Sequence, residues 1–180
     1  MTPAQLVVLK AAIAAETAPV FVAYRAGGNT GEMADWYNLA STIVVWRSTT
    51  ATSDVLNALN GANMTPVDVP DGTQLWANRA LACQGKQSAL NVIVGGQTSV
   101  ATGKANIRAS LQDSLTNLPA GVGGAMLGAG WAAVRTAIQR FATSAEKLFA
   151  SGGAGTAASP SDLAFEGGIT NSDVLQALAS

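Results

Sequence analysis

The 180-residue chain contains no histidine and a single cysteine, Cys83. With one cysteine, no disulfide can form within the chain, and a zinc site built from histidine and cysteine ligands is excluded. A Ser–His–Asp or Cys–His catalytic pair is excluded because histidine is missing. Cys83 lies in an apolar, helical context and is expected to be a small core residue. The sequence therefore assigns no catalytic residue and names no reaction.

Charged residues are also scarce. Ten Lys and Arg and eleven Asp and Glu make up 12% of the chain, about half of the ~25% usual in soluble domains, and leave a net charge of −1. This balance disfavours a nucleic-acid binder that works by bulk positive charge. Apolar residues make up 48% of the chain, and 35 residues are alanine. Because exposed apolar area on a monomer leads to aggregation, we expect other subunits to cover much of the surface; a general bias in composition is the alternative.

No segment is typical of a signal peptide or a membrane span. Near the N-terminus, Lys10 and Glu16 flank only five residues, so a long apolar run after a basic start is missing. The longest uncharged stretch, 114–134, contains Pro119 and five glycines and is too broken to cross a bilayer. We therefore expect no membrane partner, and a protein made in the cytoplasm that stays there or enters an assembly.

Helical periodicity dominates the chain. It predicts a helix from Pro3 that Pro19 ends, and further helices over residues 32–39, 52–60, 73–94, 105–118, 125–140, 145–150 and from 170 onwards. The β-branched run 43–47 favours a strand. The fold class is therefore expected to be mainly α, an irregular multi-helix bundle with one or two short strands and a flexible C-terminal arm.

The expected domain division follows from one segment of small residues. Residues 151–160, SGGAGTAASP, have the composition of a flexible linker. Residues 1–150 are therefore expected to form the helical bundle domain. Residues 151–180 are expected to form a linker and a docking arm, whose deletion would leave the bundle folded.

The motifs that would carry chemistry are incomplete. Neither Gly85-Lys86 nor Gly103-Lys104 has the upstream glycine or the following hydroxyl of a phosphate-binding loop. The glycines of 121–124 follow a predicted helix instead of a strand, so a dinucleotide site is disfavoured. The carboxylate pairs Glu32/Asp35 and Asp68/Asp71 are expected to be solvated or to cap helices. No catalytic, cofactor-binding or metal-binding residue is assigned, and no cofactor is expected.

The four tryptophans, at positions 36, 46, 76 and 131, are expected to anchor the core. Trp and Arg are also enriched where proteins bind one another. Trp46 and Arg47 end the predicted strand and precede a loop, and core and interface positions are equally compatible with them. The last predicted helix, together with the stretch before it, carries the apolar side chains expected to dock on a partner. These side chains are Phe165, Val174, Leu175 and Leu178.

Three segments carry a family resemblance. They are VWRS at 45–48, ATSAEKLFA at 142–150, and the tail that runs from ASP at 158–160 through FEG at 165–167 to Asp173-Val174. The chain resembles small tailed-bacteriophage proteins of head and tail morphogenesis, of which head–tail adaptors beneath the portal are the best-known type. The resemblance implies a helical virion component at the head–tail junction, without enzymatic activity.

The resemblance also implies partners. They are other copies of the chain in a homo-oligomeric ring of about twelve, the portal protein, the next neck or tail protein and, in passing, genomic DNA. The alternative within virions is a tail-terminator, tail-completion or capsid-decorating protein; tail-terminator rings are usually rich in strands. A small cytoplasmic enzyme or regulatory domain is the third reading, and it predicts a polar pocket.

Overall fold

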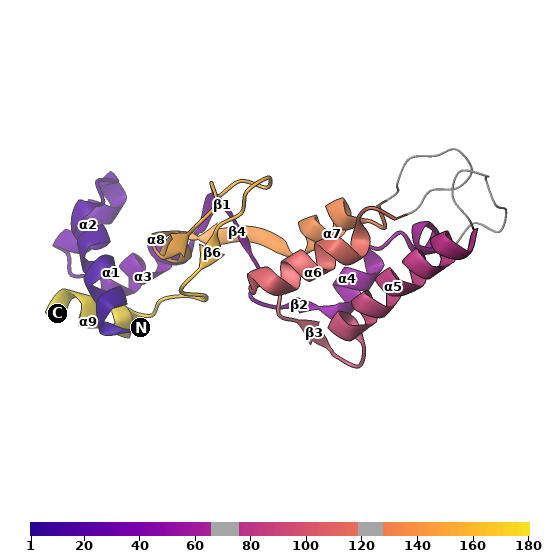
Figure 1. The fold of residues 1–180 in the computed structure, drawn as a ribbon. Coiled ribbons are helices and arrows are strands. Elements are labelled where there is room, and N and C mark those ends of the chain that lie inside the picture. Colours follow the sequence, from indigo (N-terminus) through magenta and orange to yellow (C-terminus); the bar gives the residue numbers. More distant parts are fainter. Residues whose placement is uncertain (66–75, 119–127) are drawn as a thin grey trace. The chain divides into compact units, whose positions relative to one another are not determined.

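The computed structural model describes residues 1–65, 76–118 and 128–180, and the structure is 55% helical. The mainly α fold class is thus confirmed, with a few short strands in small sheets. The chain forms two compact units (Figure 1). Unit 1 comprises residues 1–46 and 140–180, and unit 2 comprises residues 47–139. This division differs from the expected one, because residues 151–180 belong to unit 1 instead of forming a separate arm.

Unit 1 is built mainly from short helices around one core. The helices are α1 (Pro3–Ala15), α2 (Pro19–Ala26), α3 (Thr30–Asn38), α8 (Ser144–Leu148) and α9 (Asn171–Ala179). The strands are β1 (Ala40–Trp46), which pairs with β4 (Gln139–Thr143), and β5 (Ala150–Ser151), which pairs with β6 (Asp162–Leu163). Leu9, Ile13 and Phe21 form the core together with Val174 and Ala177 of α9.

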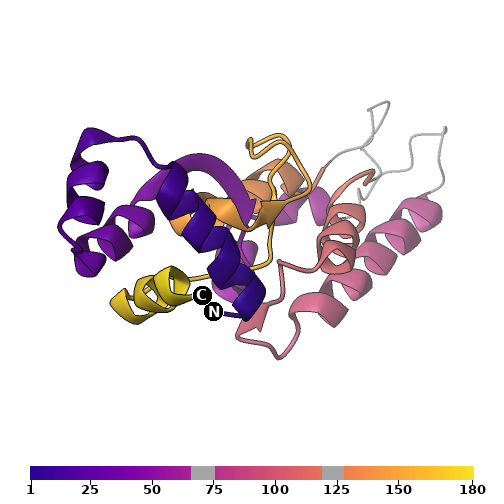
Figure 2. The same ribbon diagram turned by 90° about the vertical axis from the view of Figure 1, so that its left-hand side faces the viewer.

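The two chain ends lie side by side in unit 1 (Figures 1 and 2). The N-terminal amine is 3.4 Å from Oδ1 of Asp173, in the first turn of α9. Val174 and Ala177 are fully buried against α1 and α3. The C-terminal helix is therefore an integral part of the core of unit 1.

The segment expected to be a flexible linker is bonded to β1. The Val44 amide donates to the Gly155 carbonyl at 2.8 Å, and the Ser161 amide donates to the Val44 carbonyl at 3.0 Å. Gly155 is buried, and a Cβ there would lie 3.1 Å from the Cβ of Ile43. The small side chains of this segment therefore permit close packing on β1, which corrects the expectation of a loose tether.

Unit 2 contains α4 (Thr52–Asn57), the 3₁₀ helix η1 (Gly61–Met64), α5 (Trp76–Val94), α6 (Ala105–Leu115) and α7 (Trp131–Ala137). Two short strands, β2 (Thr50–Ala51) and β3 (Ser99–Val100), pair antiparallel with Thr50 opposite Val100. Its core is aliphatic, and its most buried side chains include Val55, Val100, Leu111, Leu115, Leu118, Val134 and Ile138.

Some predicted elements differ from the structure. The first helix ends before Pro19, as expected, but Pro19 itself begins α2, which the sequence pattern did not predict; proline suits the first position of a helix. The helix expected over 125–140 is α7 from Trp131 to Ala137 in the described part, and residues 139–143 form β4. Pairing with β1 stabilises the extended backbone there. Residues 125–127, like Asp68 and Asp71, lie outside the described residues.

Among the described residues, no single helix has the length and apolar character to cross a membrane, although α1 and α2, bent by 114°, together meet that criterion on length and composition alone.

Candidate interaction surface

One face of α3 combines acidic and apolar side chains. Glu32, Asp35, Trp36 and Leu39 follow one another at spacings of three, one and three residues, which places them on one side of the helix. With Tyr24 of α2 they line a shallow hollow. Leu39 is 58% exposed, and both carboxylates are exposed. We call these four residues the α3 face.

The apolar floor of this hollow rests on an aromatic cluster. The rings of Phe21 and Trp36 lie 5.8 Å apart, and those of Phe21 and Tyr37 lie 5.6 Å apart in an edge-to-face arrangement. Phe21 is fully buried, so its ring supports Trp36 from the core side. The α3 face is therefore supported by a rigid part of the core.

A second hollow begins on the other side of Trp36 and Leu39, where α1 and α8 approach α3. Glu16 lies at its edge and accepts hydrogen bonds of 2.9 Å from the amides of Thr17 and Ala18. The Ala18 amide in particular holds the pKa of Glu16 below its usual value. Burial raises the pKa of Tyr37 to about 12. Glu16 therefore keeps its negative charge, and Tyr37 stays protonated at neutral pH.

The last helix presents two leucines to solvent. Leu175 is 53% exposed and Leu178 is 43% exposed. Val174 of the same helix is fully buried. Of the predicted docking residues on α9, the structure leaves Leu175 and Leu178 accessible and places Val174 in the core. On the neighbouring α1, Val7 is 59% exposed and Val8 is 41% exposed. We call Val7, Val8, Leu175 and Leu178 the α1–α9 surface.

The other predicted interface residues differ in how far they are exposed. Phe165 is partly buried, and its ring packs 5.4 Å from that of Phe149. Trp46 ends β1 and is partly buried. Arg47 is exposed in unit 2, where its Nε donates to the Gln139 carbonyl at 3.1 Å. Arg47 is therefore accessible to a partner, and Phe165 mainly packs within unit 1.

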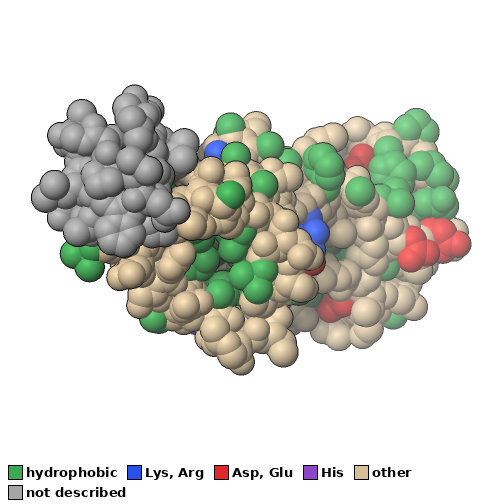
Figure 3. Space-filling model, turned by 90° about the vertical axis from the view of Figure 1, so that its right-hand side faces the viewer, with side chains coloured by type: hydrophobic (Ala, Val, Ile, Leu, Met, Phe, Trp, Pro, Cys, Tyr) green, Lys and Arg blue, Asp and Glu red, His purple; other side chains and the backbone are tan. Residues whose placement is uncertain are grey.

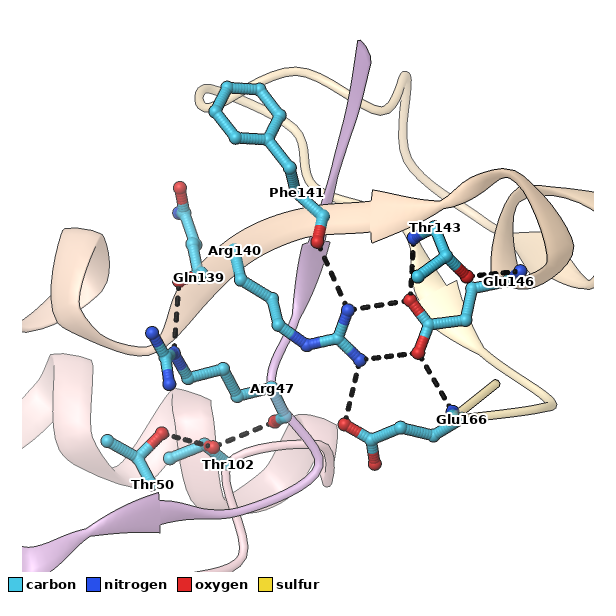
Figure 4. Close-up of polar contacts among 10 residues, drawn as sticks. Arg47, Thr50, Thr102, Gln139, Arg140, Phe141, Thr143, Glu146 and Glu166 are labelled. Atoms are coloured by element: carbon cyan, nitrogen blue, oxygen red, sulfur yellow. Dashed lines mark hydrogen bonds and ion pairs between the residues drawn. The ribbon is translucent and has the colours of Figure 1, made fainter. Parts of the chain in front are cut away.

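A buried ion pair fixes the segment that leads into α8 (Figure 4). Arg140 donates to both carboxylate oxygens of Glu146, at 2.6 and 2.8 Å, and to Glu166 at 2.9 Å. Glu146 also accepts from the amides of Thr143 and Gly167, at 2.8 and 2.9 Å. Since every oxygen of Glu146 is engaged, this pair is structural.

Sequence reasoning missed this ion pair, although a signal was present. Thr143 and Glu146 have the spacing of a capping box, and both of its hydrogen bonds form at the start of α8. The pattern locates Glu146 at a helix start. Its partner Arg140 could be found only from the pairing of β4 with β1.

Unit 2 brings a second polar cluster together around a loop contact (Figure 4). The hydroxyls of Thr50 and Thr102 lie 2.9 Å apart, and the Thr102 hydroxyl donates to the Arg47 carbonyl at 2.8 Å. The Gly103 amide donates to the Ser48 carbonyl, also at 2.8 Å. This cluster ties the loop that follows β3 to the loop that precedes β2.

The described residues contain no group of three or more His, Cys, Asp and Glu side chains that could hold a metal ion. Cys83 is buried, as the sequence predicts, and burial raises the pKa of its thiol. No family model matches the chain, and neither a curated protein nor a solved structure matches it.

Proposed function

We propose that this chain is a structural subunit of a multi-copy assembly, and that the assembly is the head–tail connector of a tailed-phage virion. The observation that carries the proposal is the number of large apolar side chains left in solvent. In unit 1 they are Val7, Val8, Val20, Val22, Leu39, Phe141, Leu175 and Leu178. Exposed apolar area of this kind marks surfaces that other proteins cover.

The charge distribution supports the same proposal. In α1, Lys10 is the one charged residue among thirteen, so the solvent side of this helix is almost uncharged. On the face shown in Figure 3, charged side chains are few, and hydrophobic side chains are exposed in several separate patches. A surface so poor in charge is better suited to contact with other subunits than to permanent hydration.

The helical content favours a connector over the main alternative. Tail-terminator rings are expected to be rich in strands, whereas this structure is 55% helical, with a few short strands. A connector subunit acts mechanically: copies of it form a ring of about twelve, which joins the portal to the next neck or tail protein and lines a passage for the genome. The virion at its head–tail junction is therefore the proposed location.

The experiment that tests this proposal is native mass spectrometry of the purified full chain over a range of concentrations. A closed ring should appear as a discrete high-mass species. A chain that stays monomeric at high concentration would contradict the proposal.

The α1–α9 surface is the proposed contact with the portal. Replacing both exposed leucines, Leu175→Ser and Leu178→Ser, should weaken co-sedimentation with the portal ring at least about tenfold, because exposed apolar side chains at an interface centre dominate affinity. Ala179→Ser, on the same helix, is the matched control. Unchanged binding of the double variant would exclude α9 as the docking element.

A further inference from the structure

The two units carry opposite net charge. Unit 1 contains four Lys and Arg and seven Asp and Glu, which gives −3. Unit 2 contains six Lys and Arg and four Asp and Glu, which gives +2. The two values add up to the −1 of the whole chain. A chain that is almost neutral overall is therefore acidic in one unit and basic in the other.

The acidic charge of unit 1 is accessible on the α3 face. Glu32 and Asp35 are exposed at the edge of the hollow, beside Trp36 and the exposed side chain of Leu39. Among the ion pairs of the described residues, none includes either carboxylate. By contrast, Glu146 of the same unit is neutralised by Arg140. The α3 face therefore offers an apolar hollow bordered by two uncompensated negative charges.

The basic charge of unit 2 is accessible at the loop contact described above. Lys104 follows Gly103, and Arg47 precedes Ser48, so the bond between Gly103 and Ser48 brings the backbones of these two exposed cationic residues close together. We call them the Arg47–Lys104 surface. Lys104 is also the residue before α6, an eleven-residue helix without an acidic residue in its first turn. The positive end of that helix adds to the charge of Lys104.

We infer that the α3 face of one copy binds the Arg47–Lys104 surface of the next copy. This inference rests on the proposed function, and it specifies how the copies join. A contact between two different surfaces is heterologous, so it repeats from copy to copy and closes into a ring when the rotation permits. Leu39 and Trp36 supply the apolar centre of the contact. The opposite charges set its register and exclude wrong pairings.

Variants with reversed charges on one side or the other distinguish this contact from other interfaces between copies. The Glu32→Lys/Asp35→Lys variant and the Arg47→Glu/Lys104→Glu variant should each weaken self-association at least about tenfold, since each places like charges opposite one another. An equimolar mixture of the two variants should assemble again, with alternating copies. The chain with all four changes should assemble alone, because both surfaces are then reversed.

The matched control is Lys10→Glu/Asp54→Lys, which reverses one exposed charge in each unit outside the proposed contact and keeps the net charge. Circular dichroism should show the native helical content in every variant. A salt series on the unaltered chain needs no substitution: association should weaken from about 0.05 M to about 1 M NaCl as the charges are screened.

The outcomes distinguish this inference from the proposed function. If the unaltered chain never associates, the proposed function itself is overturned. If it forms rings whose mass and affinity do not change with the charge reversals or with salt, only the inferred contact is overturned. Failure of the mixture and of the fourfold variant, with native helical content retained, also overturns the contact. Restored rings in both would establish it.

Discussion

Arg140 and Glu146 are joined by two parallel hydrogen bonds, of 2.6 and 2.8 Å, and the Glu146 side chain is only 2% exposed. The same guanidinium also binds Glu166, whose side chain is 38% exposed, at 2.9 Å. One arginine thus pairs with a buried and a partly exposed carboxylate, so the contributions of the two ion pairs to stability can be compared directly.

Removing the buried charge should destabilise unit 1 strongly. In Glu146→Gln, an NH₂ group replaces one carboxylate oxygen and faces the N–H donors that bind Glu146. At least one buried donor then loses its acceptor, so we expect the free energy of unfolding to fall by about 2–4 kcal/mol. Glu166→Gln should lower the free energy of unfolding by less than about 1 kcal/mol, because the Glu166 carboxylate is partly exposed to solvent. Urea unfolding followed by circular dichroism measures both, and equal losses would contradict the structural role of Glu146.

The pH dependence of stability follows from the same carboxyl group. Burial raises the pKa of Glu146, but Arg140 and the amides of Gly167 and Thr143 outweigh burial and hold the pKa below its usual value. A lowered pKa in the folded state means that the stabilisation is present above the unfolded-state pKa and is lost as the pH falls. The unaltered chain should therefore lose stability below about pH 4.5, and Glu146→Gln should lose less over that range. Thermal unfolding between pH 3 and pH 7 tests this.

Deletion of residues 151–180 is now expected to unfold unit 1, in contrast to what the sequence indicates. Two neighbouring point variants test this without truncation. Val174→Ala removes fully buried methyl groups and should destabilise unit 1 by about 1–3 kcal/mol, whereas Leu175→Ala, at a side chain 53% exposed, should stay within about 0.5 kcal/mol. Chemical unfolding of both variants gives the comparison, and a result in the reverse order would mean that α9 is not docked.

Local patterns predicted the elements whose signals are contained in a few residues. The strand near Ile43, Val44 and Val45 was found because β-branched side chains favour extended backbone. The last helix was found because Thr170 and Asp173 form a capping box. In both places the signal and the structure that it specifies lie within one short segment.

Other features depend on partners far along the chain, and no local pattern contains them. β4 is extended because it pairs with β1, about a hundred residues earlier. Residues 151–160 have the composition of a linker, yet they are bonded to Val44. The opposite charges of the two units became visible only once the boundaries at 46/47 and 139/140 were known. For the same reason, the sequence indicated only that Glu32 and Asp35 of the α3 face are solvated or cap a helix.

Two adjacent glycines allow a test of how tightly residues 151–160 are packed. Gly152 and Gly153 have φ values of +62° and +57°, so alanine is strained to a similar degree at either position. They differ in their surroundings. A Cβ at Gly152 would meet Oδ2 of Asp162 at an ordinary 3.7 Å, whereas a Cβ at Gly153 would clash with the carbonyl oxygen of Pro160.

Gly152→Ala should therefore lower the free energy of unfolding by about 1 kcal/mol, from backbone strain alone. Gly153→Ala should lower it by a further 1–3 kcal/mol or so, because the backbone of Pro160 must move. Hydrogen exchange at the Ser161 amide, which bonds to Val44, reports whether the segment has left β1. Equal effects of the two substitutions would show that the segment is free to adjust, and a loose tether would then describe it better than a packed one.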